Sequence, residues 1–476
     1  MTPTLPDVFA GKHVHLLGIG GAGMSALVPL LLARGAQVSG CDPAISGVID
    51  GLRTQGVAIA TTHDPAHAAE ADLLVHTAAI PQDHPELAAG RARGIPVLGR
   101  GECLARLMQG RTTLAVSGSH GKTSTTWMLG HLLQHGDVDP LVMVGGTVAS
   151  LGGGARIGQG PCVVEADESD GSFARIDADV AVVTNLDHEH LRHYGTFRAL
   201  EDAFNAWLRR VPADGLVIVP AATLADRVLT GVRAQVVTCG LDLGDVHVQD
   251  LKAEAEGSRF RIIAHGEDLG EVVLGIPGVH MVHNALMAVA AARHLRPNLK
   301  PQALATCERV RRRFTVHATT RGIRVVEDYG HHPAEVRATI AAARLAGGKV
   351  HVLFQPHRWT RTADCFAAFT EAFDQAHRLA LLPVYAAGET PIAGASSADL
   401  AKALVGRRAI AGDEPASVLA TANRTQAIRH LLAAANPGDT VLILGAGDVG
   451  SLAGAVQRQI AGTATTLILG DPHGHS

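Results

Sequence analysis

The sequence predicts an α/β protein of three domains, each built around a mostly parallel β-sheet. Three observations support this prediction. The chain has 476 residues, about three times the length of an ordinary domain. Short runs rich in Val, Ile and Leu alternate with alanine-rich stretches, which is typical of buried parallel strands joined by helices. Several of these runs end in glycine loops, and the chain contains 53 glycines.

The composition favours a small-molecule ligand over nucleic acid or a membrane. The formal net charge of −4 offers no basic surface to a polyanion, and an aromatic content of 3 % offers few platforms for stacked bases. No apolar run approaches the length of a membrane span, and the first residues lack the pattern of a secretory leader. The six cysteines are scattered, as expected for reduced thiols. We therefore expect a cytoplasmic protein without membrane insertion, and the oligomeric state is left open between monomer and dimer.

The first domain is expected over residues 1–104 as a Rossmann-like unit. Its strands are expected within 13–21, 36–42, 71–81 and 94–100, with a helix over 24–35. Gly18, Gly20 and Gly23 occupy the turn after the first strand. Asp42 ends the second strand at the spacing of a ribose-binding acid. The pattern predicts a nucleotide-binding turn, and a plain tight turn that merely needs glycine is the alternative.

The second domain is expected over residues 105–315. Strands are expected within 112–118, 162–168, 180–185 and 216–220, with helices over 122–135, 196–210 and 283–295. Between about 236 and 275 polar and apolar residues alternate, which predicts a small antiparallel β-sheet. The domain is therefore expected to combine a parallel nucleotide-binding sheet with a small β subdomain.

The third domain is expected over residues 316–476 as a second Rossmann-like unit. Its strands are expected within 323–329, 349–356, 379–385 and 440–447. Gly445, Gly447 and Gly450 repeat the glycine spacing of the first domain. Because a motif found twice in one chain discriminates poorly, we interpret this second copy as a tight strand-to-helix turn.

The stretch from Gly118 to Thr123 predicts a compact phosphate-binding loop. Gly118 and Gly121 allow backbone N–H groups to point into an anion site at the start of a helix. Lys122 is placed to reach phosphate oxygens, and the Thr123 hydroxyl is placed to bind Mg²⁺. No other lysine lies between Lys12 and Lys252, so the lysine in this loop is not a consequence of composition. The alternative is a bland turn.

Acidic residues and histidines follow the next two strands of the second domain. Glu165 leaves its strand first and is our candidate metal ligand. For Asp167, Glu168 and Asp170, which follow it, the alternative to a role at the site is a solvated loop acid. Among the histidines of 188–193, His190 is the candidate ligand for a second cation.

Five stretches taken together resemble the Mur ligases of peptidoglycan synthesis. They are GIGGAGMS at 18–25, GSHGKTST at 118–125, EADESD at 165–170, DYGHHPAEV at 328–336 and FQPHRWTRT at 354–362. They cover all three expected domains in the order of the family. The compact G-x-x-G-K-T loop is that family's own form of the phosphate loop.

The resemblance implies an ADP-forming amide ligase that binds ATP, two Mg²⁺ ions, UDP-N-acetylmuramate and L-alanine. It places the UDP-sugar on Gly18, Gly20, Gly21, Gly23, Met24, Ser25, Asp42 and His63. It places ATP on Gly118, Ser119, His120, Gly121, Lys122, Thr123, Ser124, His280, Asn284, Arg313 and Asp328. It places the amino acid on Tyr329, His331, Arg358 and Arg361, and the metal ions on Thr123, Glu165 and His190. Lys122, Glu165, His190 and His331 are the implied catalytic residues.

The implied reaction has two steps, and three other functions compete with it. ATP first phosphorylates the muramate carboxylate, and the alanine amine then displaces phosphate, with His331 or His332 accepting its proton. A related ligase that attaches a tripeptide is the nearest rival, but Tyr329 and Gly330 favour the alanine reaction. An NAD-dependent dehydrogenase leaves the Lys122 loop unexplained. A nucleotide-gated binding protein leaves the arginines of 354–362 without a role.

Overall fold

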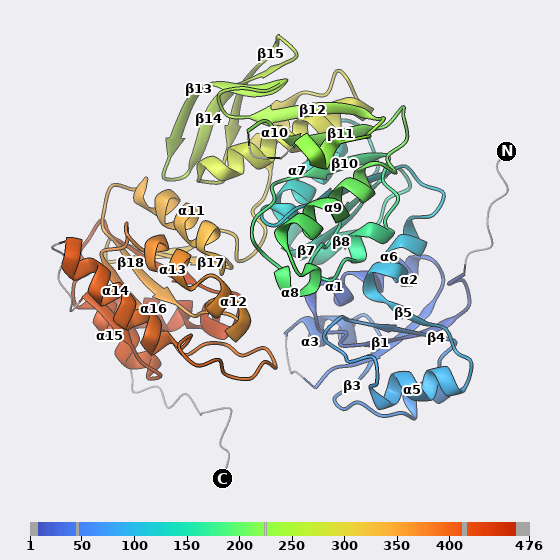
Figure 1. Cartoon of the computed structure of the whole chain (residues 1–476), viewed down its shortest axis with the longest axis horizontal. Helices are drawn as coiled ribbons and strands as arrows, with labels where there is room; N and C mark the ends of the chain where they lie inside the picture. Colours follow the sequence, from blue (N-terminus) through green and yellow to red (C-terminus); the bar gives the residue numbers. More distant parts are fainter. Residues whose placement is uncertain (1–7, 44–46, 223, 225, 412–416, 463–476) are drawn as a thin grey trace. The chain divides into compact units, whose positions relative to one another are not determined.

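The computed structural model describes residues 8–43, 47–222, 224, 226–411 and 417–462, which form three β-sheets and their connecting helices (Figure 1). The expected domain limits at residues 1 and 476 lie outside these residues. The chain divides into two compact units. The N-terminal unit runs to Arg311, except that Ala253–Ser258 and Ile276–Val279 group with the C-terminal unit, which begins at Arg312. The three-domain α/β class is confirmed, and the boundaries between the domains stay a prediction.

The first sheet is parallel throughout and has the strand order β3-β2-β1-β4-β5. Its strands are β1 His13–Leu17, β2 Gln37–Cys41, β3 Ala58–Ala60, β4 Leu73–His76 and β5 Val97–Gly99. Its helices are α1 Ala22–Ser25, α2 Leu27–Ala33, α3 Gly47–Thr54, α4 His67–Glu70, α5 Pro85–Ala92 and α6 Arg100–Met108. The strand order reverses at β1, so the loop that follows β1 stands at the crevice where such sheets bind ligands.

The second sheet has ten strands in the order β15-β14-β13-β12-β11-β10-β6-β9-β7-β8. Its strands are β6 Thr113–Ser117, β7 Leu141–Val148, β8 Gly153–Arg156, β9 Cys162–Glu165, β10 Val180–Val183, β11 Leu216–Pro220, β12 Gln235–Gly240, β13 Val246–Glu254, β14 Gly257–Ala264 and β15 Glu267–Leu274. Its helices are α7 Lys122–His135, α8 Leu191–Tyr194, α9 Phe197–Leu208 and α10 Val279–Leu295. The strands expected as a separate β subdomain extend this same sheet, because β13 pairs with β12.

The third sheet has the order β16-β17-β21-β18-β19-β20, with only β16 antiparallel to its neighbour. Its strands are β16 Thr315–Thr320, β17 Ile323–Asp328, β18 Val350–Phe354, β19 Arg378–Leu381, β20 Val418–Ala420 and β21 Thr440–Leu444. Its helices are α11 Pro333–Arg344, α12 Trp359–Asp364, α13 Phe366–Ala372, α14 Ser397–Ala411, α15 Arg424–Leu432 and α16 Ala453–Ala461.

Both faces of the third sheet are covered, as the continuous apolar strands predict. Val352 and Leu442 pack into a core with residues of α11, α13 and α14. Leu353 and Ile443, the next residues along the same strands, pack with residues of α15 and α16. Because successive side chains of a strand point to opposite faces, each strand needs apolar residues at every position. Within the described residues, no helix is both long enough and apolar enough to cross a bilayer.

Candidate functional site: a phosphate loop and an arginine-rich strand end

The loop between β6 and α7 has the backbone of an anion-binding turn. All five residues of β6 are buried, so the strand fixes where the loop begins. Gly118 and Gly121 have φ angles of +125° and +83°, a region that other residues rarely adopt. A Cβ at Gly118 would meet the Thr184 hydroxyl, and one at Gly121 would lie 2.6 Å from Asn284 Oδ1. Glycine therefore fits both positions, and the loop leads into the N-terminus of a 14-residue helix.

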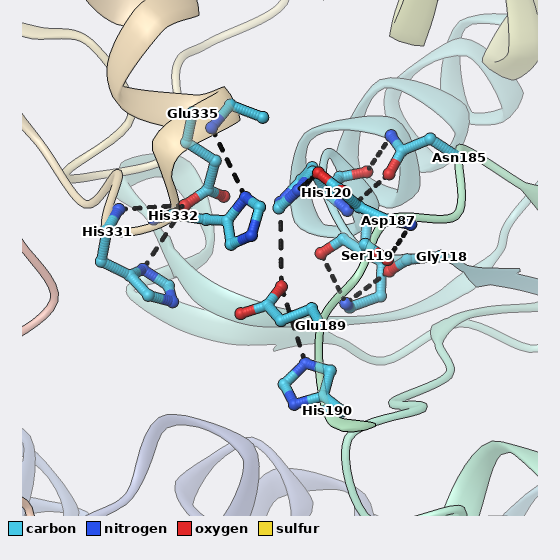
Figure 2. A network of polar contacts seen from close by, with 12 residues as sticks. Gly118, Ser119, His120, Asn185, Asp187, Glu189, His190, His331, His332 and Glu335 are labelled. Atoms are coloured by element: carbon cyan, nitrogen blue, oxygen red, sulfur yellow. Dashed lines mark hydrogen bonds and ion pairs between the residues drawn. The ribbon is translucent and has the colours of Figure 1, made fainter. Parts of the chain in front are cut away.

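A second segment, residues 184–187, holds this loop in shape (Figure 2). The His120 backbone N–H donates to Asn185 Oδ1 at 3.0 Å, and Thr184 Oγ1 donates to the His120 carbonyl at 2.6 Å. The Asp187 backbone N–H donates to Ser119 Oγ at 2.9 Å, and His120 Nε2 lies 3.1 Å from Asp187 Oδ2. The loop residues expected to bind ATP are thus ordered by the protein itself.

Lys122, the first residue of α7, turns back over the loop. Its Nζ donates to the Gly118 carbonyl at 2.6 Å and lies 2.9 and 2.8 Å from the two carboxylate oxygens of Glu168. Burial lowers the Lys122 pKa, but the neighbouring carboxylates, with Glu168 first, outweigh burial and raise the pKa above its ordinary value. The ammonium is therefore fixed in its charged form directly above the phosphate loop.

Glu168 is not a solvated loop acid. Its side chain is fully buried, with Lys122 against both oxygens and His190 Nε2 3.4 Å from Oε1. His190 has a left-handed backbone (φ +59°) at the start of α8, and its Nε2 also lies 3.7 Å from Glu189 Oε2 (Figure 2). Nothing in the local sequence distinguishes Glu168 from its acidic neighbours, because its partner Lys122 is 46 positions away in the chain.

A cavity of about 270 Å³ joins the first glycine loop to the end of β9 within the N-terminal unit. Its lining includes Gly21, Gly23, Met24, Arg100, Glu165 and Asp167. Glu165 Oε2 accepts a hydrogen bond from the Gly145 backbone N–H at 2.8 Å. Arg100 Nη2 lies 2.9 Å from Asp167 Oδ2, so Asp167 is also more than a solvated acid. We had not selected Arg100 from the sequence, because an arginine at a helix start carries no local signal.

The glycine loop of the first sheet is braced by the end of β2. The Gly18 N–H donates to the Cys41 carbonyl at 2.8 Å, and the Gly20 N–H donates to Asp42 Oδ2 at 2.9 Å. Met24 is buried, and Ser25 Oγ donates to the Ala22 carbonyl at 3.1 Å. Asp42 therefore supports the shape of the turn in addition to any ligand contact.

His63 lies below that turn and is partly buried. Its Nδ1 stands 3.1 Å from Cys41 Sγ and 3.3 Å from Glu86 Oε2. The structure thus places His63 next to Cys41, the residue before Asp42.

The start of α10 lies beside the phosphate loop. Asn284 is buried, its Oδ1 occupies the space that a Cβ at Gly121 would need, and its Nδ2 lies 3.7 Å from Met281 Sδ. His280 precedes them on the same helix and is half-buried. The segment expected to contact adenine therefore lies next to the phosphate loop at Asn284.

In the C-terminal unit, Asp328, Arg313 and Tyr329 lie together at the end of β17. Asp328 accepts hydrogen bonds from the backbone N–H groups of Phe314 and Gly330, each at 2.7 Å. Burial raises the pKa of Asp328. The Arg313 guanidinium lies 5.2 Å from the centre of the Tyr329 ring. Asp328 thus shapes the chain around the strand end, and Arg313 packs over Tyr329.

His331 and His332 have different surroundings, which Figure 2 shows together with Glu335. His332 is 5 % exposed and caps α11 in a reciprocal arrangement with Glu335. His331 is 16 % exposed at its side chain, and its Nδ1 lies 3.0 Å from the Tyr329 carbonyl. His332 therefore has a structural role, and His331 is the more accessible of the two.

The end of β18 carries an electropositive cluster. Arg358 has a left-handed backbone (φ +69°), and its N–H donates to the Tyr385 carbonyl at 2.8 Å. Arg361 Nη1 lies 3.2 Å from the His357 carbonyl. The His357 ring stacks on Tyr385 at 5.4 Å and lies 5.7 Å from the His331 ring. Burial, then Arg361 and Arg358, lowers the pKa of His357 to about 4, so this imidazole stays neutral between cations.

The second glycine loop, Gly445 to Gly450, is closed by the protein's own side chains. Arg312 Nη2 donates to the carbonyls of Gly445 and Gly447 at 2.7 and 3.0 Å. Gln355 Oε1 accepts from the Val449 N–H at 3.2 Å. These contacts match a tight strand-to-helix turn.

The N-terminal site contains a donor set that fits a hard divalent cation. Three carboxylates, Glu165, Asp167 and Glu168, face two fixed cations, Lys122 and Arg100. The group thus carries an excess of negative charge. Carboxylate and hydroxyl oxygens are the ligands that Mg²⁺ prefers in proteins.

Three family models match successive parts of the chain. Residues 13–112 match the Mur ligase family catalytic domain, residues 116–292 match the Mur ligase middle domain, and residues 312–447 match the Mur ligase glutamate ligase domain.

Individual relatives cover nearly the whole chain. It is 42 % identical over 447 residues to UDP-N-acetylmuramate–L-alanine ligase from Sorangium cellulosum, covering 92 % of this chain and 94 % of that relative. The crystal structure of UDP-N-acetylmuramate-alanine ligase from Thermotoga maritima is 27 % identical, with a TM-score of 0.78, 95 % of this chain covered and 100 % of the other. A murein peptide ligase from Psychrobacter arcticus shares the fold, with 23 % identity, a TM-score of 0.69 and coverages of 96 % and 100 %.

Proposed function

The chain belongs to the Mur ligase family, and we propose that it joins L-alanine to the carboxylate of UDP-N-acetylmuramate, converting ATP to ADP and phosphate. The observation that carries the proposal is the location of two loops in one compact unit. The phosphate loop with Lys122 and the glycine loop at Gly18–Gly23 belong to the same compact unit. Glu165 lines the cavity beside the Gly18–Gly23 loop. In this proposal Glu165 and Asp167, which line the cavity, lie between the nucleotide-activating centre and the sugar-nucleotide centre.

The triphosphate of ATP binds at residues 118–124 in this proposal. The N–H groups of the loop and the N-terminus of α7 attract phosphate oxygens. Lys122 already holds its charged ammonium over the loop, so it exchanges part of its contact with Glu168 for the phosphates. His280 and Asn284 then face the adenine, and Arg313 and Asp328 supply ribose and phosphate contacts.

Thr123, Glu165 and His190 are the proposed holders of two Mg²⁺ ions. Bound Mg²⁺ supplies positive charge that offsets repulsion between the reacting anions. No lysine lies between Lys122 and Lys252, so a modified lysine is not available in this region as an additional ligand. His190, which already contacts Glu168, performs this task together with the carboxylates.

The first step brings two anions together. At about 4 Å and an effective dielectric of ~20, each pair of unit charges repels by roughly 4 kcal/mol. The muramate carboxylate approaches from the first glycine loop, where Gly18, Gly20, Gly21, Gly23, Met24, Ser25, Asp42 and His63 hold the UDP-sugar. Lys122 counters charge on the transferred phosphoryl group, and Arg100 is suited to hold the carboxylate from its place in the cavity wall.

The second step takes place with residues of the C-terminal unit. Arg358 and Arg361 anchor the alanine carboxylate, since both lie in the electropositive cluster at the end of β18. Tyr329 lines the amino-acid site, and His331 accepts the proton from the amine. His331 suits this role better than His332, whose ring already caps α11.

The proposed activity sets the remaining expectations. We place the reaction in the cytoplasm, where ATP is available and where the six cysteines, all free thiols here, stay reduced. The substrates are small molecules, and monomer and dimer stay equally open. The domain assignment follows the reaction: UDP-sugar binding in 1–104, ATP binding in 105–315 and amino-acid binding in 316–476.

Measurement of phosphate release tests the proposal. The purified protein is incubated with ATP, Mg²⁺ and UDP-N-acetylmuramate, and single amino acids or an L-alanine-headed tripeptide are added separately. We expect phosphate release that requires both the sugar nucleotide and L-alanine. Phosphate release that requires the sugar nucleotide and the tripeptide, but does not occur with L-alanine, supports the related tripeptide ligase instead. Phosphate release at the same rate without the sugar nucleotide contradicts the proposal.

A further inference from the structure

A buried group of metal-ligating side chains lies in the first sheet and is not used by the proposed reaction. We call it the His-Cys-Glu cluster, and its members are His15 on β1, Cys41 on β2, His67 on α4 and Glu86 on α5. Their ligand atoms all lie within 4.8 Å of one another. His15 is 3 % exposed, and Cys41 and Glu86 are 0 % exposed.

The spacing of these atoms is close to that around a tetrahedral ion. Glu86 Oε1 lies 2.7 Å from His67 Nδ1 and 3.2 Å from His15 Nε2. Cys41 Sγ lies 3.6 Å from each oxygen of Glu86. Nitrogen, oxygen and sulfur ligands bind Zn²⁺ at ~2.0–2.3 Å, which separates neighbouring ligands by roughly 3.3–3.8 Å. Of the pairs that include Glu86, the one with His67 is the shortest and must move apart to admit an ion.

One ring nitrogen in the cluster lacks a hydrogen-bond partner among the described residues. His15 Nε2 is buried and faces Glu86, but it does not meet the geometry of a hydrogen bond to it. The other ring nitrogen of His15 lies 2.8 Å from Ser39 Oγ. A metal-bound histidine has this arrangement, with one nitrogen facing the ion and the other held by an outer partner.

We propose that the His-Cys-Glu cluster binds one Zn²⁺ ion. Thiolate and imidazole ligands favour Zn²⁺ over Mg²⁺, so the cluster and the phosphate site select different ions. Coordination releases the Cys41 proton to solvent, and the thiolate and the Glu86 carboxylate then balance the charge of the ion. A neutral buried centre avoids the cost of an isolated buried charge.

The bound ion acts as a clamp beneath the first glycine loop. The Cys41 carbonyl accepts hydrogen bonds from the N–H groups of Gly18 and Ile19, so fixing Cys41 fixes the start of the loop. His67 and Glu86 attach α4 and α5 to the same point. Zn²⁺ therefore stabilises the sugar-nucleotide domain and does not take part in phosphoryl transfer.

Zinc and cobalt binding to the full-length chain test this inference. The protein is stripped with a chelator and titrated with Zn²⁺ in excess Mg²⁺, which fills the hard oxygen site. We expect one tightly bound Zn²⁺ and a raised melting temperature. Cys41→Ser lowers the Zn²⁺ affinity at least about tenfold. Cys103→Ser removes another fully buried cysteine of this domain and leaves the affinity unchanged.

Cobalt keeps the inference testable if Cys41→Ser does not fold. Co²⁺ added to the wild-type chain is expected to give a sulfur-to-cobalt charge-transfer band, and His67→Asn, at a partly exposed position, is expected to weaken it. A wild-type chain without this band, or a folded Cys41→Ser that binds Zn²⁺ as tightly as wild type, overturns the inference and leaves a hydrogen-bonded network.

Discussion

The two glycine turns at Gly118–Gly121 and Gly445–Gly450 begin alike and end differently. Each follows a fully buried parallel strand and contains a glycine with positive φ. In the first turn, the helix begins with Lys122, whose ammonium lies over the loop. In the second turn, Arg312 donates hydrogen bonds to two carbonyls of the loop, and Asp448 is the first residue of the short helix.

Glycine spacing thus determines the backbone conformation of each turn, and the charge of the first helical side chain determines which ligand the turn can bind. A cation at the start of a helix adds to the positive end of the helix dipole, whereas an acid opposes it. Asp448 is further engaged by Arg424 and Gln355, so the second turn is closed by internal contacts. We expect the first turn to bind an anion and the second to be structural.

Replacement of the loop lysine is expected to have the largest effect. Lys122→Met is expected to lower kcat/KM for ATP-dependent phosphate release by about 10³-fold or more, because one preformed charge on the phosphoryl group is lost. Steady-state kinetics with all three substrates measure the effect. Less than tenfold loss is incompatible with a phosphate-binding role.

A double variant separates catalysis from folding. Lys122→Met leaves the buried Glu168 without its partner, so part of any loss reflects destabilisation. In Lys122→Met/Glu168→Gln the uncompensated charge is removed. We expect thermal stability to recover while activity stays low; recovery of activity as well would assign Lys122 to folding alone.

Alanine substitution at one glycine of each turn tests whether the two turns have different roles. Gly118→Ala and Gly445→Ala each force a side chain into a left-handed backbone, which costs about 1–3 kcal/mol of stability. We expect similar losses in denaturant unfolding for the two variants. Only Gly118→Ala should also raise the KM for ATP, and an equal rise in both variants contradicts the division of roles.

His190 extends the comparison to the residues around the first turn. His190→Ala is expected to reduce activity about tenfold and to raise the Mg²⁺ concentration needed for half-maximal rate, since a ligand and a neighbour of Glu168 are removed. His188→Ala changes another histidine of the same segment and serves as the control. An unchanged Mg²⁺ dependence in His190→Ala assigns the metal elsewhere.

The smallest expected effect is a pH dependence near the second turn. His357 stacks on Tyr385, which lies against the Gly447 position, and its pKa is lowered to about 4, chiefly by burial. The pKa of His357 is lower in the folded state than in the unfolded state. The contribution of its neutral ring to the free energy of unfolding is therefore fully present above about pH 6.5 and is lost as the pH falls toward 4. Between these pH values, the free energy of unfolding of His357→Phe should fall by about 1–2 kcal/mol less than that of the wild type. Identical profiles in urea unfolding exclude this residue as the cause.

Sequence patterns were sufficient where structure is local. Most of the long apolar strands were found because buried parallel strands are continuous Val, Ile and Leu runs, but β7, whose glycines interrupt its apolar run, was missed. The strands β3 and β20 have three residues each and were missed, whereas β5, of the same length, was found because apolar residues precede it in the sequence. The alternation in β13–β15 predicted strands correctly, but the pairing of β13 with β12 is a long-range contact that alternation does not encode.

In the candidate site too, features that are local in sequence were predicted, and features that depend on long-range contacts were not. The phosphate loop was found because its glycines and lysine are adjacent in sequence. Glu168 was not distinguished from its acidic neighbours, because its complete burial depends on Lys122 and His190 folding around it. Arg100 was missed for the same reason, as its partner Asp167 is 67 positions away in the chain.

Calorimetric titration with a non-hydrolysable ATP analogue and Mg²⁺ measures nucleotide binding without turnover. It tests whether the Lys122 turn, and not the Gly445 turn, binds the triphosphate. We predict one nucleotide per chain, with affinity reduced at least about a hundredfold in Lys122→Met/Glu168→Gln and unchanged in Gly445→Ala. Wild-type affinity in the double variant, or loss of binding only in Gly445→Ala, would contradict the account.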